Sequence, residues 1–389
     1  MQNKKLLLSA TVFLLLISSS CVQADHHTNI PAAVSEQPNL NPKIQAAILL
    51  DVSNSMDGLI DQAKAQLWNM VSTMGKATCK GVAPKIEIAL YEYGRTTNSI
   101  SAGYVKQLSA FTTDLDKLSD ILFSLNTDGG DEYCGQVIFT SLNNLSWDPS
   151  PESYKVIFIA GNEDFLQGKL HYKKACALAK QKGVIVNTIY CGERMQGIRE
   201  HWSVNDECGG GSFTNINQNE KINEIPTPYD DEIITLNEKL NGTYIAYGTD
   251  GFTKSASQKQ LDVKNRNINK SVEVKRITVK SNKSLYKNES WDMVDKFEDD
   301  KEIVSKIDKS SLTDSLKNKS NAEIQKIVIE KKKERGDIQK QISEKNTMRE
   351  KYIATEKLKN NNRNNTATLE SEIEKIIRKQ AKQFKMVIQ

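Results

Sequence analysis

Hydrophobic residues between positions 44 and 228 follow two alternating patterns along the chain. Short, continuous apolar runs predict strands that are buried on both faces of a sheet. Between them, apolar residues recur every three or four positions, which predicts amphipathic helices. Strands and helices in this order favour an α/β fold, a doubly wound and mostly parallel sheet with helices on both faces. The predicted strands are 44–50, 86–91, 104–111 (at a sheet edge), 154–160, 184–190 and 212–216, and the predicted helices are 59–74, 115–125, 137–142 and 172–182.

The pattern changes after residue 228, and we place a domain boundary there. All eight prolines lie at or before Pro228, and Gly336 is the only glycine after Gly251, so long helices are permitted in 229–389. A strict heptad repeat is not sustained, which argues against a coiled coil. We expect this Lys- and Asn-rich extension to be a separable unit of amphipathic helices, in a loose bundle or docked on the sheet domain. Partial disorder is the alternative for so polar a segment.

Two short features of the extension have simple interpretations. The Asn-rich run 359–365 predicts a loop. The triplet Arg335-Gly336-Asp337 lies within a predicted helix, and we interpret it as a chance occurrence.

Residues 1–24 have the features of a signal peptide. Lys4 and Lys5 precede an apolar run, 6–17, that is too short to cross a bilayer, and Val22-Gln23-Ala24 offers a small-residue cleavage site. We therefore expect export, with 25–43 as a linker before the 44–228 domain.

Cys21 offers an alternative form of processing. It could become a lipid-bearing N-terminus, although Ser18 stands where leucine is usual in such signals. The expected location is the periplasm or the outer membrane, with secretion as a further destination. Because no later segment is apolar enough to span a membrane, only such a lipid would attach the protein to one.

The net charge is +4 over 389 residues, which is small and predicts no nucleic-acid-binding surface. The basic run at 331–333 is followed at once by Glu334, as on a solvated helix face.

Export makes disulfide bonds plausible for the five cysteines that follow Cys21. Cys191 follows a predicted strand, and Cys208 precedes three glycines shortly afterwards, so this pair closes a short loop and is our first choice. Cys79 with Cys134 is a second option, and Cys176 would then be the free thiol. A zinc site competes with this interpretation, but no two cysteines have C-x-x-C spacing and the histidines are scattered.

The stretch Asp51-Val52-Ser53-Asn54-Ser55 carries the strongest chemical signal. It follows the first predicted strand, and open α/β sheets bind ligands at the carboxyl ends of their strands. One carboxylate and two hydroxyls on alternating residues suit a hard divalent cation, most simply Mg²⁺, with Ca²⁺ or Mn²⁺ as alternatives. A helix cap is the competing interpretation, because Asp and Ser often satisfy free amides at a helix start.

These segments together resemble a von Willebrand factor type A domain. In that family the metal-ion-dependent adhesion site begins with Asp-x-Ser-x-Ser after the first strand, which implies that Asp51, Ser53 and Ser55 are metal ligands. The resemblance also implies a ligand in the second loop. There Thr127-Asp128-Gly129-Gly130-Asp131-Glu132 places Asp131 where the family usually has threonine.

The third loop departs from the family pattern. The family has Thr-Asp-Gly after the fourth strand, whereas this chain has Ala160-Gly161-Asn162-Glu163-Asp164, with Gly161 in place of the aspartate. Asn162, Glu163 or Asp164 would compensate if the loop bends differently. The alternative is a degenerate, metal-free site.

The resemblance extends to a branch of exported bacterial proteins that carry a helical tail. It rests on Ile157-Phe158-Ile159-Ala160-Gly161-Asn162-Glu163, on 186–192 and 208–213, and on Leu240-Asn241-Gly242-Thr243-Tyr244-Ile245-Ala246-Tyr247-Gly248. It implies no enzymatic activity.

Three functions compete on this basis. The first is a metal-dependent module that binds a protein partner through a carboxylate, and the second is an envelope scaffold that assembles through its helical tail around a degenerate site. The third, a divalent-metal hydrolase, is disfavoured, because position 53 is Ser where a nucleophile and acid pair favours Asp-x-Asp, and no Ser-His-Asp or Cys-His arrangement is evident.

Overall fold

The computed structural model describes residues 42–204, 207–217, 225–359 and 369–388. Its centre is a six-stranded sheet with the strand order β4-β3-β1-β5-β6-β7. β4 is antiparallel to β3, and the remaining neighbours are parallel. The predicted α/β fold with a mostly parallel sheet is thus confirmed, and the antiparallel β4 makes the sheet mixed. Its strands are β1 (Lys43–Asp51), β3 (Lys85–Tyr93), β4 (Lys106–Thr112), β5 (Tyr154–Gly161), β6 (Ile185–Cys191) and β7 (Phe213–Ile216).

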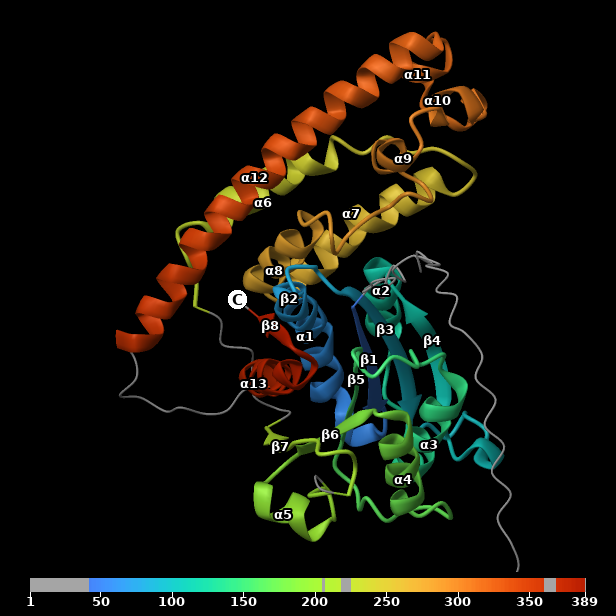
Figure 1. Cartoon of the computed structure of the whole chain (residues 1–389), viewed down its shortest axis with the longest axis vertical. Helices are drawn as coiled ribbons and strands as arrows, with labels where there is room; N and C mark the ends of the chain where they lie inside the picture. Colours follow the sequence, from blue (N-terminus) through green and yellow to red (C-terminus); the bar gives the residue numbers. More distant parts are fainter. Residues whose placement is uncertain (1–41, 205–206, 218–224, 360–368, 389) are drawn as a thin grey trace, which may run out of the picture. The chain divides into compact units, whose positions relative to one another are not determined.

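Alternate residues of the central strand serve two separate hydrophobic cores. In β1, Ile48 and Leu50 face one core, whereas Ala47 and Leu49 face the other. The second core includes residues of α3 (Cys134–Asn144) and α4 (Tyr172–Lys182), and these two helices lie on the same face of the sheet in Figure 1. Burial on both faces explains why these strands appear in the sequence as continuous apolar runs.

The first core is covered by helices from distant parts of the chain. α1 (Asp57–Gly75) and α2 (Leu115–Ser124) follow the sheet strands in sequence, but α8 (Lys270–Lys280) and α13 (Leu369–Ala381) belong to the extension. α1 contacts both α8 and α13 (Figure 1). A small antiparallel pair, β2 (Ala77–Cys79) with β8 (Met386–Ile388), adds to the same side.

The C-terminal extension is helical from residue 230, as predicted. One of its cores joins α6, α8 and α12 through Ile233, Val274 and Ile338, and a second lies around Met293 and Phe297. The helices are α6 (Asp230–Asn241), α7 (Gly251–Ile268), α9 (Met293–Asp299), α10 (Ile303–Lys306), α11 (Asp314–Lys317) and α12 (Asn321–Lys359), in addition to α8 and α13.

The extension packs on the sheet domain, which is one of the two arrangements expected for it. Residues 41–389 form one compact unit. Val272 and Val279 of α8 and Ile373 and Ile377 of α13 are buried in the same core as the sheet. The extension therefore completes the sheet domain, and the boundary at residue 228 remains a proposal about sequence organisation.

Arg335 illustrates how the extension uses its charged residues. Its guanidinium is buried and donates to Asp292 at 2.7 Å and to Asp295 at 2.6 Å. The Arg-Gly-Asp triplet is therefore part of the helical packing of α12.

Several predictions concern residues that the structure does not describe. They are the signal peptide and its Cys21 alternative, all but the last two residues of the 25–43 linker, and residues 360–365 of the predicted loop. Within the described residues, no helix combines the length and apolarity needed to cross a bilayer.

Candidate functional site

The Asp-x-Ser-x-Ser stretch lies at the carboxyl end of β1, between the ends of β3 and β5. Asp51 is the last residue of β1 and is paired in register with Tyr93 of β3. Its side chain is fully buried, and its Oδ1 accepts a hydrogen bond of 2.8 Å from the Ser53 amide. Asp51 Oδ2 has no hydrogen-bond partner. One oxygen of the carboxylate is thus hydrogen-bonded, and the other has no hydrogen-bond partner.

The geometry does not support the helix-cap interpretation. Met56 precedes α1, and no side chain caps that helix. Ser53 precedes a short 3-10 turn, Asn54–Met56, and its side chain makes no cap hydrogen bond there either.

The two serines and the third loop meet at this edge. Ser53 Oγ lies 3.4 Å from Ser55 Oγ, and Asn162 Nδ2 donates to Ser55 Oγ at 3.2 Å. The structure therefore brings Asn162 to the stretch that carries both serines. It places Asp51, Ser53, Ser55 and Asn162 together.

In the second loop, Glu132 lies against Asp51, whereas the predicted Asp131 does not. Asp131 is exposed, and its Oδ2 accepts a hydrogen bond of 3.0 Å from the Tyr133 hydroxyl. Glu132 is only 5 % exposed, and its Oε2 has no partner. A methyl group on Gly94 would lie 2.9 Å from Glu132 Cγ and 3.0 Å from Asp51 Oδ1, so both carboxyl side chains border this glycine.

The two buried carboxyl groups perturb each other. Burial raises the pKa of Asp51 above its ordinary value. Burial, reinforced by the charge of Asp51, raises the pKa of Glu132 still further. Two adjacent carboxylates in a place with little water are stable only with a proton or a cation between them.

Tyr93 occupies the space that an aspartate at position 161 would need. A methyl group on Gly161 would lie 2.5 Å from the Tyr93 hydroxyl oxygen and 3.0 Å from Asp51 Oδ2. That hydroxyl donates to the Ala160 carbonyl at 2.9 Å, which fixes the phenol ring across the strand end. A side chain at position 161 would therefore meet Tyr93 and Asp51 in this structure.

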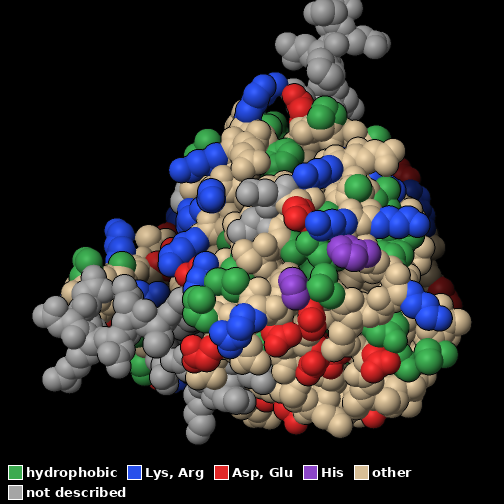
Figure 2. All heavy atoms as spheres, turned by 90° about the horizontal axis from the view of Figure 1, so that it is seen from below, with side chains coloured by type: hydrophobic (Ala, Val, Ile, Leu, Met, Phe, Trp, Pro, Cys, Tyr) green, Lys and Arg blue, Asp and Glu red, His purple; other side chains and the backbone are tan. Residues whose placement is uncertain are grey.

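The other two acidic residues of the third loop do not join the serines. Asp164 Oδ1 accepts from the Leu166 amide at 2.9 Å and lies 3.0 Å from His201 Nδ1. Glu163 accepts from Gln167 Nε2 at 3.3 Å. Its charge acts on Asp51 and Glu132 and contributes to their raised pKa values. Figure 2 shows acidic side chains gathered on one face of the molecule, close to its histidines.

The donor set at the strand ends fits a hard divalent cation. Asp51 Oδ2 and Glu132 Oε2 are buried oxygens without partners, and the Ser53 and Ser55 hydroxyls lie 3.4 Å from each other in the residues that follow Asp51. Carboxylate and hydroxyl oxygens are the ligands that Mg²⁺, Ca²⁺ and Mn²⁺ prefer. Among the described residues, no group of three or more His, Cys, Asp or Glu side chains could hold a metal ion.

Sequence reasoning missed Glu132 and Tyr93. Glu132 adjoins Asp131, the predicted ligand. No sequence pattern in an irregular loop indicates which of two adjacent carboxylates turns inward. Tyr93 ends the strand next to β1, so its place beside Asp51 follows only from strand register.

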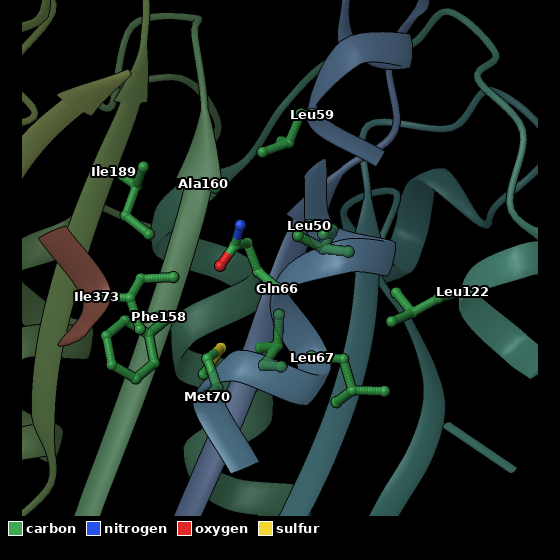
Figure 3. Close-up of a pocket in the computed structure, with 12 residues that line it drawn as sticks. Leu50, Leu59, Gln66, Leu67, Met70, Leu122, Phe158, Ala160, Ile189 and Ile373 are labelled. Atoms are coloured by element: carbon green, nitrogen blue, oxygen red, sulfur yellow. The ribbon is translucent and has the colours of Figure 1, made fainter. Parts of the chain in front are cut away.

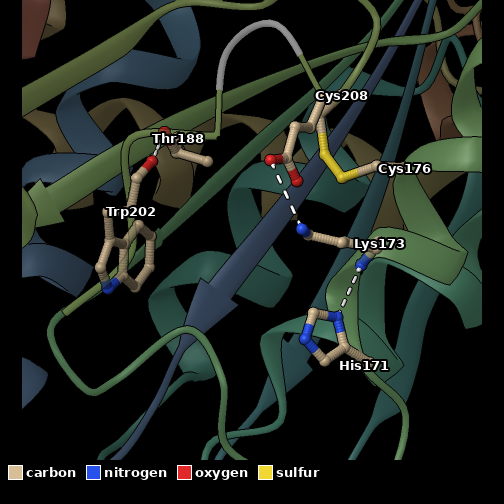
Figure 4. The surroundings of a disulfide bond; sticks show 7 residues. His171, Lys173, Cys176, Thr188, Trp202 and Cys208 are labelled. Carbon is tan, nitrogen blue, oxygen red and sulfur yellow. Dashed lines mark hydrogen bonds and ion pairs between the residues drawn. A yellow bond between two sulfur atoms is a disulfide. The ribbon is translucent and has the colours of Figure 1, made fainter.

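The disulfide bond joins Cys176 to Cys208, and the predicted Cys191–Cys208 pair is wrong. Figure 4 shows the bond between α4 and the glycine-rich loop. Cys191 lies in the core on one side of the sheet, whereas Cys176 and Cys208 lie in the core on the other. The same separation keeps Cys79 from Cys134, and both are free and buried, as is Cys191.

Comparisons with known proteins find likenesses in solved structures alone. No protein-family profile matches the chain, and no curated protein matches it. The proximal thread matrix protein 1 of the mussel byssus is similar over 45% of this chain and 41% of its own, with 12% identity and a TM-score of 0.33. The SpRpn10 VWA domain is similar over 45% of this chain and 88% of its own, with 15% identity and a TM-score of 0.32.

A third solved structure shows a likeness of similar extent. The von Willebrand factor type A protein of Catenulispora acidiphila is similar over 45% of this chain and 39% of its own, with 15% identity and a TM-score of 0.34. The chain thus spans about two fifths of the length of the mussel and C. acidiphila proteins. Such distant likenesses leave the partner and the cation of this chain open.

Proposed function

We propose that this protein is an exported module of the von Willebrand factor type A kind, which binds a protein partner at a cation-containing sheet edge. The proposed location is the periplasm, or the outer membrane if Cys21 carries a lipid. The cation is Mg²⁺ in the first place, with Ca²⁺ or Mn²⁺ as alternatives. We propose a binding role without enzymatic activity, as the resemblance implies.

One observation carries the proposal. Asp51 Oδ2 and Glu132 Oε2 are buried at the strand ends without a hydrogen-bond partner. A buried ionised oxygen without a partner is costly, and a bound divalent cation would satisfy both at once. The Ser53 and Ser55 hydroxyls and Asn162 contact one another at the same strand ends and would complete the shell directly or through water.

The vestigial-site scaffold remains the second candidate. It is favoured by the Tyr93 hydroxyl, which fills the place of the family's third-loop aspartate. In that case the two carboxyl groups would share a proton and the site would not respond to cations.

Calorimetric titration of the full chain with Mg²⁺, Ca²⁺ and Mn²⁺ separates the two candidates. We expect saturable binding of at least one cation and a higher unfolding temperature in its presence. Asp51→Asn should abolish both, and the isosteric amide is preferred to alanine because Asp51 is fully buried. Far-ultraviolet circular dichroism checks that the variant is folded. Parent protein that binds none of the three cations would contradict the proposal and favour the scaffold.

A further inference from the structure

The second loop is held rigidly against the end of β1. The Asp128 amide donates to the Val52 carbonyl at 2.9 Å, and the Thr96 amide donates to the Gly129 carbonyl at 2.9 Å. A methyl group on Gly130 would lie 2.6 Å from the Gly94 carbonyl oxygen, so only glycine permits this approach. The path of this loop is therefore held by contacts with the residues that follow β1 and β3.

Asp131 is directed away from the buried carboxylates by its neighbour. The Tyr133 hydroxyl donates to Asp131 Oδ2. The Tyr133 ring itself is confined, because methyl groups on Gly103 and Gly168 would lie 3.2 Å and 2.7 Å from its atoms. Both glycines have positive φ, which favours glycine and so leaves room for the ring. Tyr133 thus holds Asp131 at the exposed surface.

Glu132 is directed to the opposite side. Its amide donates to Gln167 Oε1 at 3.2 Å, which links the second loop to the third. Its side chain is buried beside Gly94 and Asp51, and its Oε2 is unpartnered. Glu132 and Asp51 thus lie beside the same glycine, and each has one buried oxygen without a hydrogen-bond partner, as two ligands of one ion would.

We propose that Glu132 is the second carboxylate ligand of the cation, so that the site is closed by the chain itself and takes no carboxylate from the partner. This inference rests on the proposed cation site. With Asp51 alone, a bound divalent cation would keep a net charge of +1 and attract an acidic side chain. With Glu132 as well, the charge is neutralised, and the attraction for a further carboxylate disappears.

The surrounding charges agree with a partner that is not acidic. Asp131 and Glu163 are exposed, and Asp164 is half-buried. These carboxylates would repel an acidic side chain that approached the cation. The cation would therefore shape the loops of the binding surface, and a neutral or basic surface of the partner would contact them.

Mn²⁺ titration of the full chain tests the inference, with calorimetry and the electron paramagnetic resonance spectrum of the ion as readouts. Glu132→Gln should weaken Mn²⁺ binding by more than about tenfold, because an amide is a poorer ligand than a carboxylate. Asp131→Asn is the matched control, one residue away, and should leave the affinity within about twofold of the parent.

Acetate distinguishes a closed site from an open one. In the parent protein, acetate should not change Mn²⁺ affinity. In Glu132→Ala, which leaves room for a small carboxylate, added acetate should restore much of the lost affinity and move the Mn²⁺ spectrum toward that of the parent. Circular dichroism checks folding, and Glu132→Gln carries the test if the alanine variant does not fold.

The outcomes separate this inference from the proposed function. If the parent binds Mn²⁺ and Glu132→Gln binds it equally well, Glu132 is not a ligand, although the cation site stands. If acetate tightens binding to the parent, the site has an open position and the closed-site inference is wrong. If the parent binds no cation, the proposed function and this inference both fail.

Discussion

Tyr93 shows how one side chain changes the ligands that a strand edge can supply. Its hydroxyl bonds the Ala160 carbonyl and lies where a side chain at position 161 would begin. An aspartate at position 161 would therefore clash with this tyrosine. In the proposed site, Glu132 of the second loop supplies the second carboxylate beside Asp51.

We expect Gly161→Ala to destabilise the protein by about 1–3 kcal/mol, because the added methyl group meets the Tyr93 oxygen in a closely packed site. Combining it with Tyr93→Phe should cost less than the sum of the two single changes, since the phenyl ring lacks that oxygen. Denaturant unfolding measures all three. Gly336→Ala is the control, because nothing lies within 4 Å of that position in α12 and alanine favours helices. Additive effects at positions 161 and 93 would contradict the steric explanation.

Gln66 is a polar residue in an apolar place. It lies on α1 beside a cavity of about 30 Å³ lined mainly by apolar side chains, among them Leu67, Phe158 and Ile373. Figure 3 shows its amide directed from the helix toward the strands. Its Oε1 is buried and has no hydrogen-bond partner.

We expect Gln66→Met to stabilise the protein by about 1 kcal/mol, because it removes an unsatisfied buried acceptor and places apolar atoms in the cavity. The unfolding midpoint in urea measures the change. Gln62→Met, one turn earlier on α1, is the matched control: Gln62 Nε2 donates to the Asn217 carbonyl at 3.0 Å, so its loss should be neutral or destabilising. A less stable Gln66→Met protein would show that this amide has a partner in solution.

At the scale of elements, α13 is the clearest case of a helix that packs against segments distant from it in the sequence. It follows β7 only after the whole of α6–α12, yet it packs on α1 and contributes to the first core of the sheet. Gln380 of α13 accepts from the Tyr154 hydroxyl at 2.8 Å and donates to Asn187 Oδ1 at 2.7 Å. These bonds fix α13 over β5 and β6.

We expect Ile377→Ala to cost about 2–5 kcal/mol, because Ile377 is fully buried between α13 and the sheet core. Ile329→Ala on α12 removes the same atoms from a side chain that is 50% exposed and should change stability by less than about 0.5 kcal/mol. Thermal unfolding compares the two. Equal effects would mean that α13 does not belong to the core, as a separable extension would require.

At the scale of the whole molecule, a buried ionic cluster joins the helical extension to the sheet domain. Arg276 of α8 donates to Asp116 of α2 at 2.6 Å and to Asp262 of α7 at 2.7 Å. Lys280 also pairs with Asp262, at 2.7 Å, and the Arg276 guanidinium lies over the Trp68 ring of α1. Burial alone would raise the pKa of Asp262, but Lys280 and Arg276 outweigh it and hold the pKa well below its ordinary value.

This cluster predicts loss of stability in acid. The pKa of Asp262 is lower in the folded than in the unfolded chain, so its contribution is complete above the unfolded value of about 3.9 and is lost as the pH falls below it. Asp262→Asn should cost about 3–5 kcal/mol at pH 7, because it leaves buried Arg276 and Lys280 without their charge partner. It should also remove part of the acid dependence.

Asp120→Asn is the control for this prediction. Asp120 pairs with Lys264 at the surface, where an ion pair contributes about 0–1 kcal/mol. Urea unfolding between pH 3 and pH 7 follows both variants. An Asp262→Asn protein with the acid sensitivity of the parent would show that other carboxyl groups cause it.

Local patterns in the chain account for much of what was predicted correctly. Apolar runs such as 154–160 must be buried on both faces wherever they fold, so β5 and its neighbours could be predicted from residue order alone. β4 was expected at a sheet edge, and it is the edge strand next to β3. Residues 51–55 follow the first strand directly, and chain connectivity alone places them at the carboxyl edge.

Only the tertiary structure decided which distant residues meet there. Which of Asp131 and Glu132 turns inward depends on a loop path held by Gly94, Gly130 and Tyr133, and no local propensity encodes that path. The partner of Cys208 depends on which face of the sheet each cysteine occupies. The position of α13 depends on the packing of its apolar stripe on one face of the sheet, although some 150 residues separate α13 from β7. The periodicity of a segment specifies which of its residues must be buried. The contacts between distant segments specify which partner buries them.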